Sequence, residues 1–409
     1  MPPFNNETYH PMSEYQTLDD IEFQGKRVLL RADLNVPMRN GQISDASRIT
    51  EAAPGLAELL DGGAGVVLTS HLGRPKGQVA AEFSLEPIAA ELAKALGGIK
   101  ITFVDGWDGA RPEDAAASLK PGELLLLENL RFEPGEEAND PAFAARLAGL
   151  ADIYVDDAFS CTHRAHASIT GVAAHLPSAA GRLMQKELEA LQTALENPAH
   201  PVAAIIGGNK ISTKLGVLEN LIAKVDHLLI GGAMAHTFLL ADGIDVGRSL
   251  SEPGMIETAR RITAAAAEAG CKIMLPTDVR VAAEFAENAP SKALPVDAIP
   301  ADQMALDIGP QTARAMNAVI AASRTVIWNG PMGAFEVTPF DTGTNTLALT
   351  VAERTRMGAL KSIAGGGDTM AALVHAEAAK DFNYVSLAGG AFLEWLEGRA
   401  LPGIEALKG

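Results

Sequence analysis

Short apolar segments alternate with amphipathic stretches along most of the chain. Each apolar segment has at most six residues, the length of a buried strand, and the stretches between them have helical spacing. In the first half the strand-like segments are 27–31, 65–69, 99–104, 124–127 and 153–155, and helical patterns occupy 47–61, 85–96 and 141–150. Strands alternating with helices predict a parallel sheet covered by helices on both faces.

The second half has the same alternation of strand-like and helical segments but a different sequence. Its strand-like segments are 202–206, 227–230, 272–275, 325–328, 361–364 and 384–387, and a long Ala-rich helical pattern covers 257–269. No fixed-period repeat relates the halves, which excludes a solenoid. The chain is therefore expected to be an α/β protein with two parallel sheets.

A domain boundary is expected between residues 180 and 200. The segment 184–195 has a strong helical pattern and is followed by Asn197, Pro198 and Pro201. Proline and asparagine in this position end a helix before the next strand. This helix would connect two domains and act as a hinge, or it would be an ordinary crossover helix within one large domain.

Composition and charge limit the classes of partner. The 409 residues include 47% hydrophobic and 21% charged residues, which is typical of a globular protein. The formal net charge of −18 argues against binding to nucleic acid or to an anionic membrane. Any anionic ligand must therefore be bound by a local cluster of cations.

Cysteine usage and the N-terminus both favour a soluble cytoplasmic protein. Cys161 and Cys271 are isolated and form no CxxC motif, as expected of free thiols in a reducing compartment. Residues 1–20 lack the basic start and apolar core of a secretory signal and are interpreted as a flexible polar extension. No apolar run is long enough to span a bilayer.

Basic residues gather where the strands of the first half end. Ligands of open parallel sheets bind beyond the carboxyl ends of the strands, so these side chains should share one cleft. Arginine is suited to bidentate contacts with phosphate and carboxylate groups, which predicts a small ligand with several negative charges. The residues concerned are Arg31, Asp33, Asn35, Arg48, His71, Arg74, Arg131, His163, Arg164 and His166.

Each of these residues also has a simpler interpretation. A single arginine after a strand often forms a surface ion pair, and Asp33 and Asn35 are suited to capping a turn. His163 and His166 could be structural. Their HxxH spacing would also suit zinc, but no third ligand of the usual motifs accompanies it.

Glycine clusters end the strands of the second half. Glycine allows backbone N–H groups to approach a phosphate closely, especially at a helix N-terminus. Neither GxxxxGK[ST] nor a GxGxxG after the first strand is present, so the chain is not a P-loop protein. Lys210 and Lys214 follow the first cluster, and Asp368 follows another as a candidate magnesium-binding carboxylate. A single Gly-Gly pair would more simply be a turn or a helix cap.

Together these motifs resemble the phosphoglycerate kinase family. The resemblance covers the chain from Arg31 to Gly403 and depends on the order of its motifs, which are RADLNVP, SHLGRP, LENLRF, DDAF, THRAHAS, GGNKISTK, DIGP, WNGPMGAFE, GGGDT and LEWLEGRALPG. It implies two Rossmann-like domains joined by a hinge helix. The implied parts are an extension (1–20), a 3-phosphoglycerate domain (21–182), hinge helix and linker (183–200), a nucleotide domain (201–392) and a tail that packs back on the first domain (393–409).

The resemblance also implies residue roles. The residues that would bind 3-phosphoglycerate or 1,3-bisphosphoglycerate are Asp33, Leu34, Asn35, Arg48, His71, Leu72, Gly73, Arg74, Arg131 and Arg164, with Arg31 supporting them. Those that would bind ATP or ADP are Lys210, Lys214, Gly309, Asn329, Glu336, Gly366, Gly367, Asp368 and Thr369, with Asp368 near Mg²⁺. The catalytic groups would be Arg48, Lys210, Lys214 and the backbone amides at Gly366, Gly367, Gly389 and Gly390.

The implied activity is reversible phosphoryl transfer from 1,3-bisphosphoglycerate to ADP, in glycolysis, gluconeogenesis or carbon fixation, by a monomer. Neither nucleophile carries a proton at neutral pH, so alignment and charge neutralisation would replace a general base. The alternatives are a kinase for another carboxylic acid and an inactive homologue that serves as a binding scaffold.

Four positions depart from the usual family pattern, all on the nucleotide side. Asn209 replaces a small residue, Ala233 replaces a glycine, His236 replaces an aromatic residue, and Leu387–Ala388 replaces Thr-Gly. The charged groups that would carry the chemistry are retained, so we expect an active enzyme whose nucleotide affinity and base preference could differ.

Overall fold

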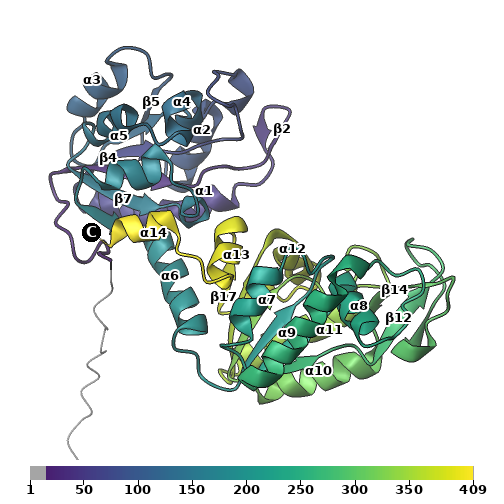
Figure 1. The fold of residues 1–409 in the computed structure, drawn as a ribbon. Helices are drawn as coiled ribbons and strands as arrows, with labels where there is room; N and C mark the ends of the chain where they lie inside the picture. The colour runs from purple at the N-terminus through teal and green to yellow at the C-terminus, as the bar shows by residue number, and fades with distance from the viewer. Residues whose placement is uncertain (1–14, 409) are drawn as a thin grey trace, which may run out of the picture. The chain divides into compact units, whose positions relative to one another are not determined.

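Two six-stranded parallel sheets organise the computed structural model, which describes residues 15–408 (Figure 1). Each sheet is the centre of one compact unit. Unit 1 comprises the described residues up to Glu187 together with those from Ala400, and unit 2 comprises Leu188–Arg399. The division falls inside the helix α6 (Arg182–Leu195).

The sheet of unit 1 has its first strand near the centre. The order is β5-β6-β4-β1-β7-β8, and all neighbouring strands are parallel. The strands are β1 (Arg27–Ala32), β4 (Gly65–Thr69), β5 (Ile101–Val104), β6 (Leu124–Leu127), β7 (Ile153–Asp157) and β8 (Ser178–Ala180). Their nearly continuous apolar sequences are those of strands buried on both faces.

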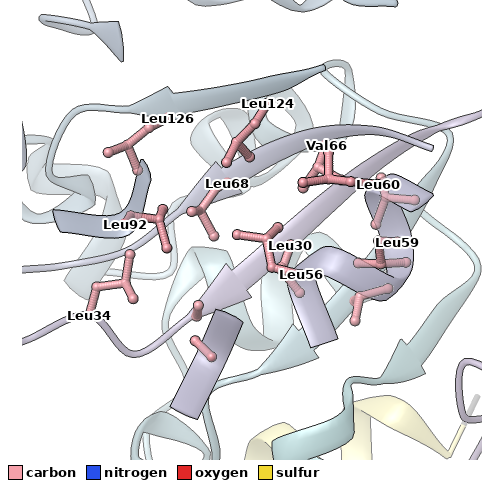
Figure 2. Close-up of a cluster of buried hydrophobic side chains, with 14 of the residues drawn as sticks. Leu30, Leu34, Leu56, Leu59, Leu60, Val66, Leu68, Leu92, Leu124 and Leu126 are labelled. Atoms are coloured by element: carbon pink, nitrogen blue, oxygen red, sulfur yellow. The ribbon is translucent and has the colours of Figure 1, made fainter. Parts of the chain in front are cut away.

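Helices cover both faces of this sheet. Alternate strand residues such as Leu30, Leu68 and Leu126 pack against α1 (Ser47–Asp61) and α2 (Glu86–Ala95), as Figure 2 shows. The remaining elements of unit 1 are a hairpin of β2 (Met38–Arg39) and β3 (Gln42–Ile43), the helices α3 (Arg111–Ala117), α4 (Pro134–Glu137) and α5 (Pro141–Ala148), the π-helix η4 (Ala167–Gly171), and α14 (Pro402–Leu407). The C-terminal α14 packs on η4 and β8, and Gly403 N donates to the Thr162 carbonyl at 2.8 Å.

The second sheet has the order β11-β10-β9-β15-β16-β17 and is also parallel throughout. Its strands are β9 (Val202–Ile206), β10 (His227–Ile230), β11 (Lys272–Met274), β15 (Thr325–Asn329), β16 (Lys361–Gly365) and β17 (Tyr384–Ser386). The helices are α7 (Leu215–Leu221), α8 (Gly232–Ala241), α9 (Ile256–Ala269), α10 (Pro310–Ala322), α11 (Thr342–Arg356), α12 (Gly367–His375) and α13 (Gly390–Leu396). Apolar residues of α10, α11 and α12 form one core with this sheet.

A small antiparallel sheet in unit 2 was not predicted from the sequence. Its order is β13-β12-β14, with β12 (Asp278–Ala282), β13 (Ser291–Pro295) and β14 (Met304–Ile308). Strand β13 is largely exposed and contains Lys292 and Pro295, so it lacks the apolar run that identified the other strands.

Residues 15–20, interpreted from the sequence as part of a flexible extension, pack against unit 1. Tyr15 and Leu18 are buried, and Thr17 forms a bridge with Ala180 beside β8. These two apolar residues lie in a polar stretch without periodicity, which explains why the sequence did not indicate packing. The earlier part of the expected extension, residues 1–14, lies outside the described residues.

Gly207 follows β9 at a point where two loops meet. A Cβ atom at this position would overlap the Pro331 carbonyl group. We expect Gly207→Ala to lower the free energy of unfolding by about 1–3 kcal/mol, the usual cost of overpacking. The matched control is Gly254→Ala, because a Cβ there meets nothing within 4 Å and the change should stay within about 0.5 kcal/mol. Urea denaturation measures both, and equal stability of the two variants would contradict the close approach.

Candidate active site

Three of the predicted basic residues of unit 1 lie at the carboxyl ends of three adjacent strands. Arg31 lies near the end of β1, His71 follows β4, and Arg131 follows β6 in the 3-10 turn η2 (Leu130–Phe132). Strand β7, on the other side of β1, ends at Asp156 and Asp157. Parallel strands thus bring residues that are far apart in the sequence to one sheet edge.

Arg31 and His71 form the buried centre of this edge. Arg31 is 1% exposed, and its Nη2 lies 3.1 Å from His71 Nδ1. A guanidinium group only donates, so His71 Nδ1 must accept and the proton of the neutral ring lies on Nε2. Burial lowers the pKa of His71 well below its ordinary value, and the charges of Arg31, Arg131, Arg164 and Arg48 lower it further. His71 is therefore a neutral hydrogen-bond donor at neutral pH.

A buried carboxylate supports Arg31 from behind. Arg31 Nε donates to Ser168 Oγ at 3.0 Å, and Ser168 Oγ donates to Glu136 Oε1 at 2.6 Å. Burial acts to raise the pKa of Glu136, but nearby His166, the Arg31 charge and the Ser168 hydrogen bond together hold it below its ordinary value. Glu136 is therefore ionised and balances part of the positive charge.

Arg131 has donor groups that no atom of residues 15–408 satisfies. Its side chain is 3% exposed, and Nη1 donates to the Gly73 carbonyl at 2.7 Å. Its Nε and Nη2 atoms are buried and have no hydrogen-bond partner among the described residues. Nε lies 3.5 Å from Glu137 Oε1, too poorly oriented for a hydrogen bond. Unsatisfied buried guanidinium groups are costly, so this is a site that favours an anion.

The other predicted residues of this cluster surround the same edge. Arg48, on α1, forms an ion pair with Asp33, which also accepts from Ser160. Asn35 Oδ1 accepts from Gly73 N at 2.9 Å. Four further predicted residues belong to the loops at this edge. Leu34 and Leu72 are buried, and Arg74 is exposed. Arg164 is half-buried, and its Nε lies 3.1 Å from His163 Nε2.

The predicted nucleotide residues of unit 2 also follow neighbouring strands. Lys210 and Lys214 follow β9, Asn329 ends β15, Gly366 and Gly367 follow β16, and Gly389 and Gly390 follow β17. Burial lowers the pKa of Lys214 to about 8, and the charge of Asp368 opposes this shift. Lys210 is exposed. The lysines and the amide-rich loops thus lie along one sheet edge.

A cavity of about 730 Å³ lies beside this edge within unit 2. Glu336 and Asp368 line it, together with Gly208 of the lysine loop. Seven of the nine predicted nucleotide residues do not contribute to its wall, and these are Lys210, Lys214, Gly309, Asn329, Gly366, Gly367 and Thr369. The cavity has the size and position expected of a small-molecule site in an α/β sheet.

Asn329 and Thr369 use their side chains inside the protein. Asn329 Nδ2 donates to the Gly365 carbonyl at 2.7 Å. Thr369 Oγ1 donates to the same carbonyl at 2.8 Å and accepts from Gly330 N at 2.7 Å. Between them, Gly366 has φ +101°, and a Cβ there would come within 2.8 Å of Asn329 Nδ2. These contacts therefore shape the loop before α12, and among the described residues Asn329 Oδ1 has no hydrogen-bond partner.

Comparison with known proteins identifies the family. The phosphoglycerate kinase family model matches residues 18–399. The phosphoglycerate kinase of Sinorhizobium medicae is 55% identical over 395 residues, which cover 96% of this chain and 99% of that protein. The chain belongs to the phosphoglycerate kinase family. It is therefore a kinase of the transferase class, in the group that uses a carboxyl group as acceptor.

Solved structures of the family share the fold. The phosphoglycerate kinase of Coxiella burnetii has a TM-score of 0.90 and 42% identity, covering 96% of this chain and 98% of that one. The phosphoglycerate kinase of Pyrococcus horikoshii has a TM-score of 0.78 and 29% identity with the same coverage. The predicted fold class, with two parallel-sheet cores, is confirmed.

Most departures from the family pattern lie at the cavity. Asn209, Ala233 and His236 all contribute to its wall. Leu387 and Ala388 instead precede Gly389, and Ala388 N donates to Ser386 Oγ at 3.1 Å. Three of the four positions expected to depart from the family pattern thus line the cavity.

The apolar wall of the cavity was missed by the sequence analysis. Val279, Phe285 and Leu306 belong to the antiparallel sheet and its loops, and Leu250 and Val337 complete this wall. Apolar residues in loops and short strands carry no motif, so only the three-dimensional arrangement identifies them. Phe285 and Leu250 are each 56% exposed, which is a signal for binding that the structure alone provides.

The HxxH segment does not resemble a metal site. His163 Nε2 accepts from Arg164 Nε, and His166 Nδ1 lies 3.6 Å from Glu136 Oε1. Within residues 15–408, no group of three or more His, Cys, Asp or Glu side chains is arranged to hold a metal ion. Asp368 is a single carboxylate on the cavity wall, which suits Mg²⁺ because this ion usually takes one or two protein carboxylates and completes its shell with phosphates and water.

No helix within residues 15–408 is both long and apolar enough to cross a membrane.

Asp156 makes the stability of unit 1 depend on pH. Burial raises its pKa to about 7, against the lowering effects of the Ala158 N–H and Arg31, and nearby Asp157 raises it further. Its Oδ2 has no hydrogen-bond partner among the described residues, because the Tyr154 hydroxyl donates to the Ser168 carbonyl instead. The folded protein therefore keeps a proton that the unfolded chain loses near pH 4.

A raised folded-state pKa contributes stability at low pH that is lost as the pH rises through about 7. We expect wild type to lose stability relative to Asp156→Asn between pH 5 and pH 7, by up to about 1.4 kcal/mol per pH unit. The difference should level off above about pH 8. Denaturant unfolding of both proteins at matched pH values measures it, and a constant difference would show that Asp156 is ionised throughout.

Proposed function

We propose that this protein catalyses reversible, Mg²⁺-dependent phosphoryl transfer from 1,3-bisphosphoglycerate to ADP, giving 3-phosphoglycerate and ATP. The pathway would be glycolysis, gluconeogenesis or carbon fixation, and the working form a cytoplasmic monomer. The family relationship supports the reaction type, and the chemistry of the two units supports the two substrates.

One observation carries the proposal for the acid substrate. Arg131 has buried, unsatisfied Nε and Nη2 groups next to other arginines, in a chain whose formal net charge is −18. Like charges repel at such a site until an anion enters. 3-Phosphoglycerate carries a phosphate and a carboxylate, which match two sets of guanidinium donors. The neutral His71 would donate from Nε2 without adding to the repulsion.

The cavity of unit 2 suits the nucleotide. Its apolar wall offers a surface for a base, Glu336 offers a carboxylate for the ribose hydroxyl groups, and the loops before α12 and α13 offer backbone amides for phosphates. Asp368 would hold Mg²⁺, which would neutralise charge on the bound phosphates.

The chemistry is a direct exchange of one phosphoryl group. A β-phosphate oxygen of ADP forms a bond to the phosphorus of the acyl phosphate, and the bond from phosphorus to the carboxyl oxygen breaks. The carboxylate leaves with the electron pair, so no proton is transferred. Arg48, Lys210, Lys214 and the loop amides would align the groups and stabilise the charge on the transferring phosphoryl. Each ligand belongs to a different unit, so we expect closure about α6 to precede transfer.

The activity is tested with purified protein, 3-phosphoglycerate, ATP and Mg²⁺. A dehydrogenase that reduces the acyl phosphate couples the reaction to NADH oxidation. The proposal predicts turnover that requires both substrates and is lost on chelation of Mg²⁺. A folded protein that binds both ligands without turnover would instead be a binding scaffold, and turnover with other carboxylic acids would indicate a different carboxylate kinase.

Arg48 supplies a separate prediction. We expect Arg48→Ala to lower kcat by at least about 100-fold, the scale of losing a charged partner of the transition state. The matched control is Arg111→Ala, because Arg111 is exposed at the start of α3 and pairs with Asp105. Near-normal kcat in a folded Arg48→Ala variant, judged by circular dichroism, would exclude the role.

A further inference from the structure

His236 is a polar residue in the otherwise apolar part of the cavity wall. It lies on α8, is 6% exposed, and lines the cavity. A buried polar side chain normally satisfies all of its hydrogen-bonding groups. His236 satisfies only one of its two ring nitrogens.

The partner of that nitrogen fixes the state of the ring. His236 Nδ1 lies 2.8 Å from the Leu250 carbonyl oxygen, which can only accept, so Nδ1 carries the proton. Burial lowers the pKa of His236, which keeps the ring neutral and leaves a lone pair on Nε2. Nε2 makes no hydrogen bond to any residue that the structure describes. His236 therefore presents one free acceptor at the cavity wall.

The neighbours of His236 show which part of the cavity it serves. Its partner Leu250 and Phe285, another residue of the cavity wall, are exposed apolar side chains, suited to the faces of a flat heterocycle. Gly208 and Asp368 line the same cavity and belong to the loops suited to phosphates and their metal ion. The hydrogen bond from His236 Nδ1 to the Leu250 carbonyl places His236 in the apolar part of the cavity wall.

We propose that His236 makes this site selective for 6-aminopurine nucleotides, by accepting a hydrogen bond from the exocyclic amino group at Nε2. The inference rests on the proposed function, because it requires a nucleotide in the cavity. A 6-oxopurine such as guanine would place a carbonyl oxygen against the lone pair, and two acceptors repel.

The size of the effect follows from the unpaired group. A buried site built to bond a polar ligand group discriminates strongly against an analogue that lacks it, since its own polar atom is then left unpaired. His236 faces an open cavity that water can enter, so we expect a smaller factor of about tenfold in kcat/KM. The loss should be in KM, because the base lies away from the transferring phosphoryl group.

The test compares ATP with purine riboside triphosphate, which differs only by lacking the 6-amino group. Wild type should use ATP about tenfold better in kcat/KM, and His236→Phe should reduce this ratio to about one. His236→Gln is the matched control, because its amide oxygen can accept a hydrogen bond and should retain part of the preference. A wild-type ratio near one, or the same ratio in wild type and His236→Phe, would overturn the proposal.

Binding separates this inference from the proposed function. Calorimetry with ADP and purine riboside diphosphate measures the same preference without turnover. A protein that binds ADP about tenfold more tightly but transfers no phosphoryl group would support the role of His236 and contradict the proposed activity. Turnover with equal use of both nucleotides would support the activity and overturn the role of His236. Failure to bind either diphosphate would contradict both.

Discussion

The burial of positive charge at the end of a parallel sheet is the constraint on which the site of unit 1 depends. Removing a guanidinium group from water is costly unless hydrogen bonds and opposite charges replace the lost solvent. Arg31 has such compensation from Ser168, the Ala32 carbonyl and the ionised Glu136 behind them. Arg131 has much less, with one backbone carbonyl and a poorly oriented carboxylate. An anionic ligand would complete what the protein leaves unsatisfied.

The same sheet geometry supports a different kind of anion binding in unit 2. Both sheets gather loops from distant parts of the sequence at the carboxyl ends of adjacent strands. In unit 1 these loops carry arginine side chains, whereas in unit 2 they carry glycines, whose amides can approach phosphates closely. The antiparallel sheet adds an apolar wall on one side of the second edge, so the cavity of unit 2 is suited to a flat heterocycle.

The parallel architecture could be predicted because most strands of the two main sheets are short apolar runs between polar loops. Strand β8 (Ser178–Ala180) was missed, because the sequence Ser-Ala-Ala is too short and too weakly apolar to indicate a strand. The charged and glycine-rich motifs also predicted which loops carry function, since their position after strands follows from that architecture. The apolar cavity wall could not be predicted, because residues such as Phe285 and Leu306 are brought together only by the antiparallel sheet. The hydrogen bonds of the Thr369 hydroxyl with the Gly365 carbonyl and the Gly330 N–H could not be predicted from the sequence either.

The most direct test of the account is the binding of 3-phosphoglycerate and ADP to wild type and Arg131→Gln by titration calorimetry. The account predicts that the variant binds 3-phosphoglycerate at least about tenfold more weakly, since charged hydrogen bonds contribute about 1.5–3 kcal/mol each. It also predicts unchanged affinity for ADP, whose proposed site belongs to the other unit. Unchanged affinity for 3-phosphoglycerate in a folded variant would contradict the claim that the buried, unsatisfied Arg131 is there to bind the acid substrate.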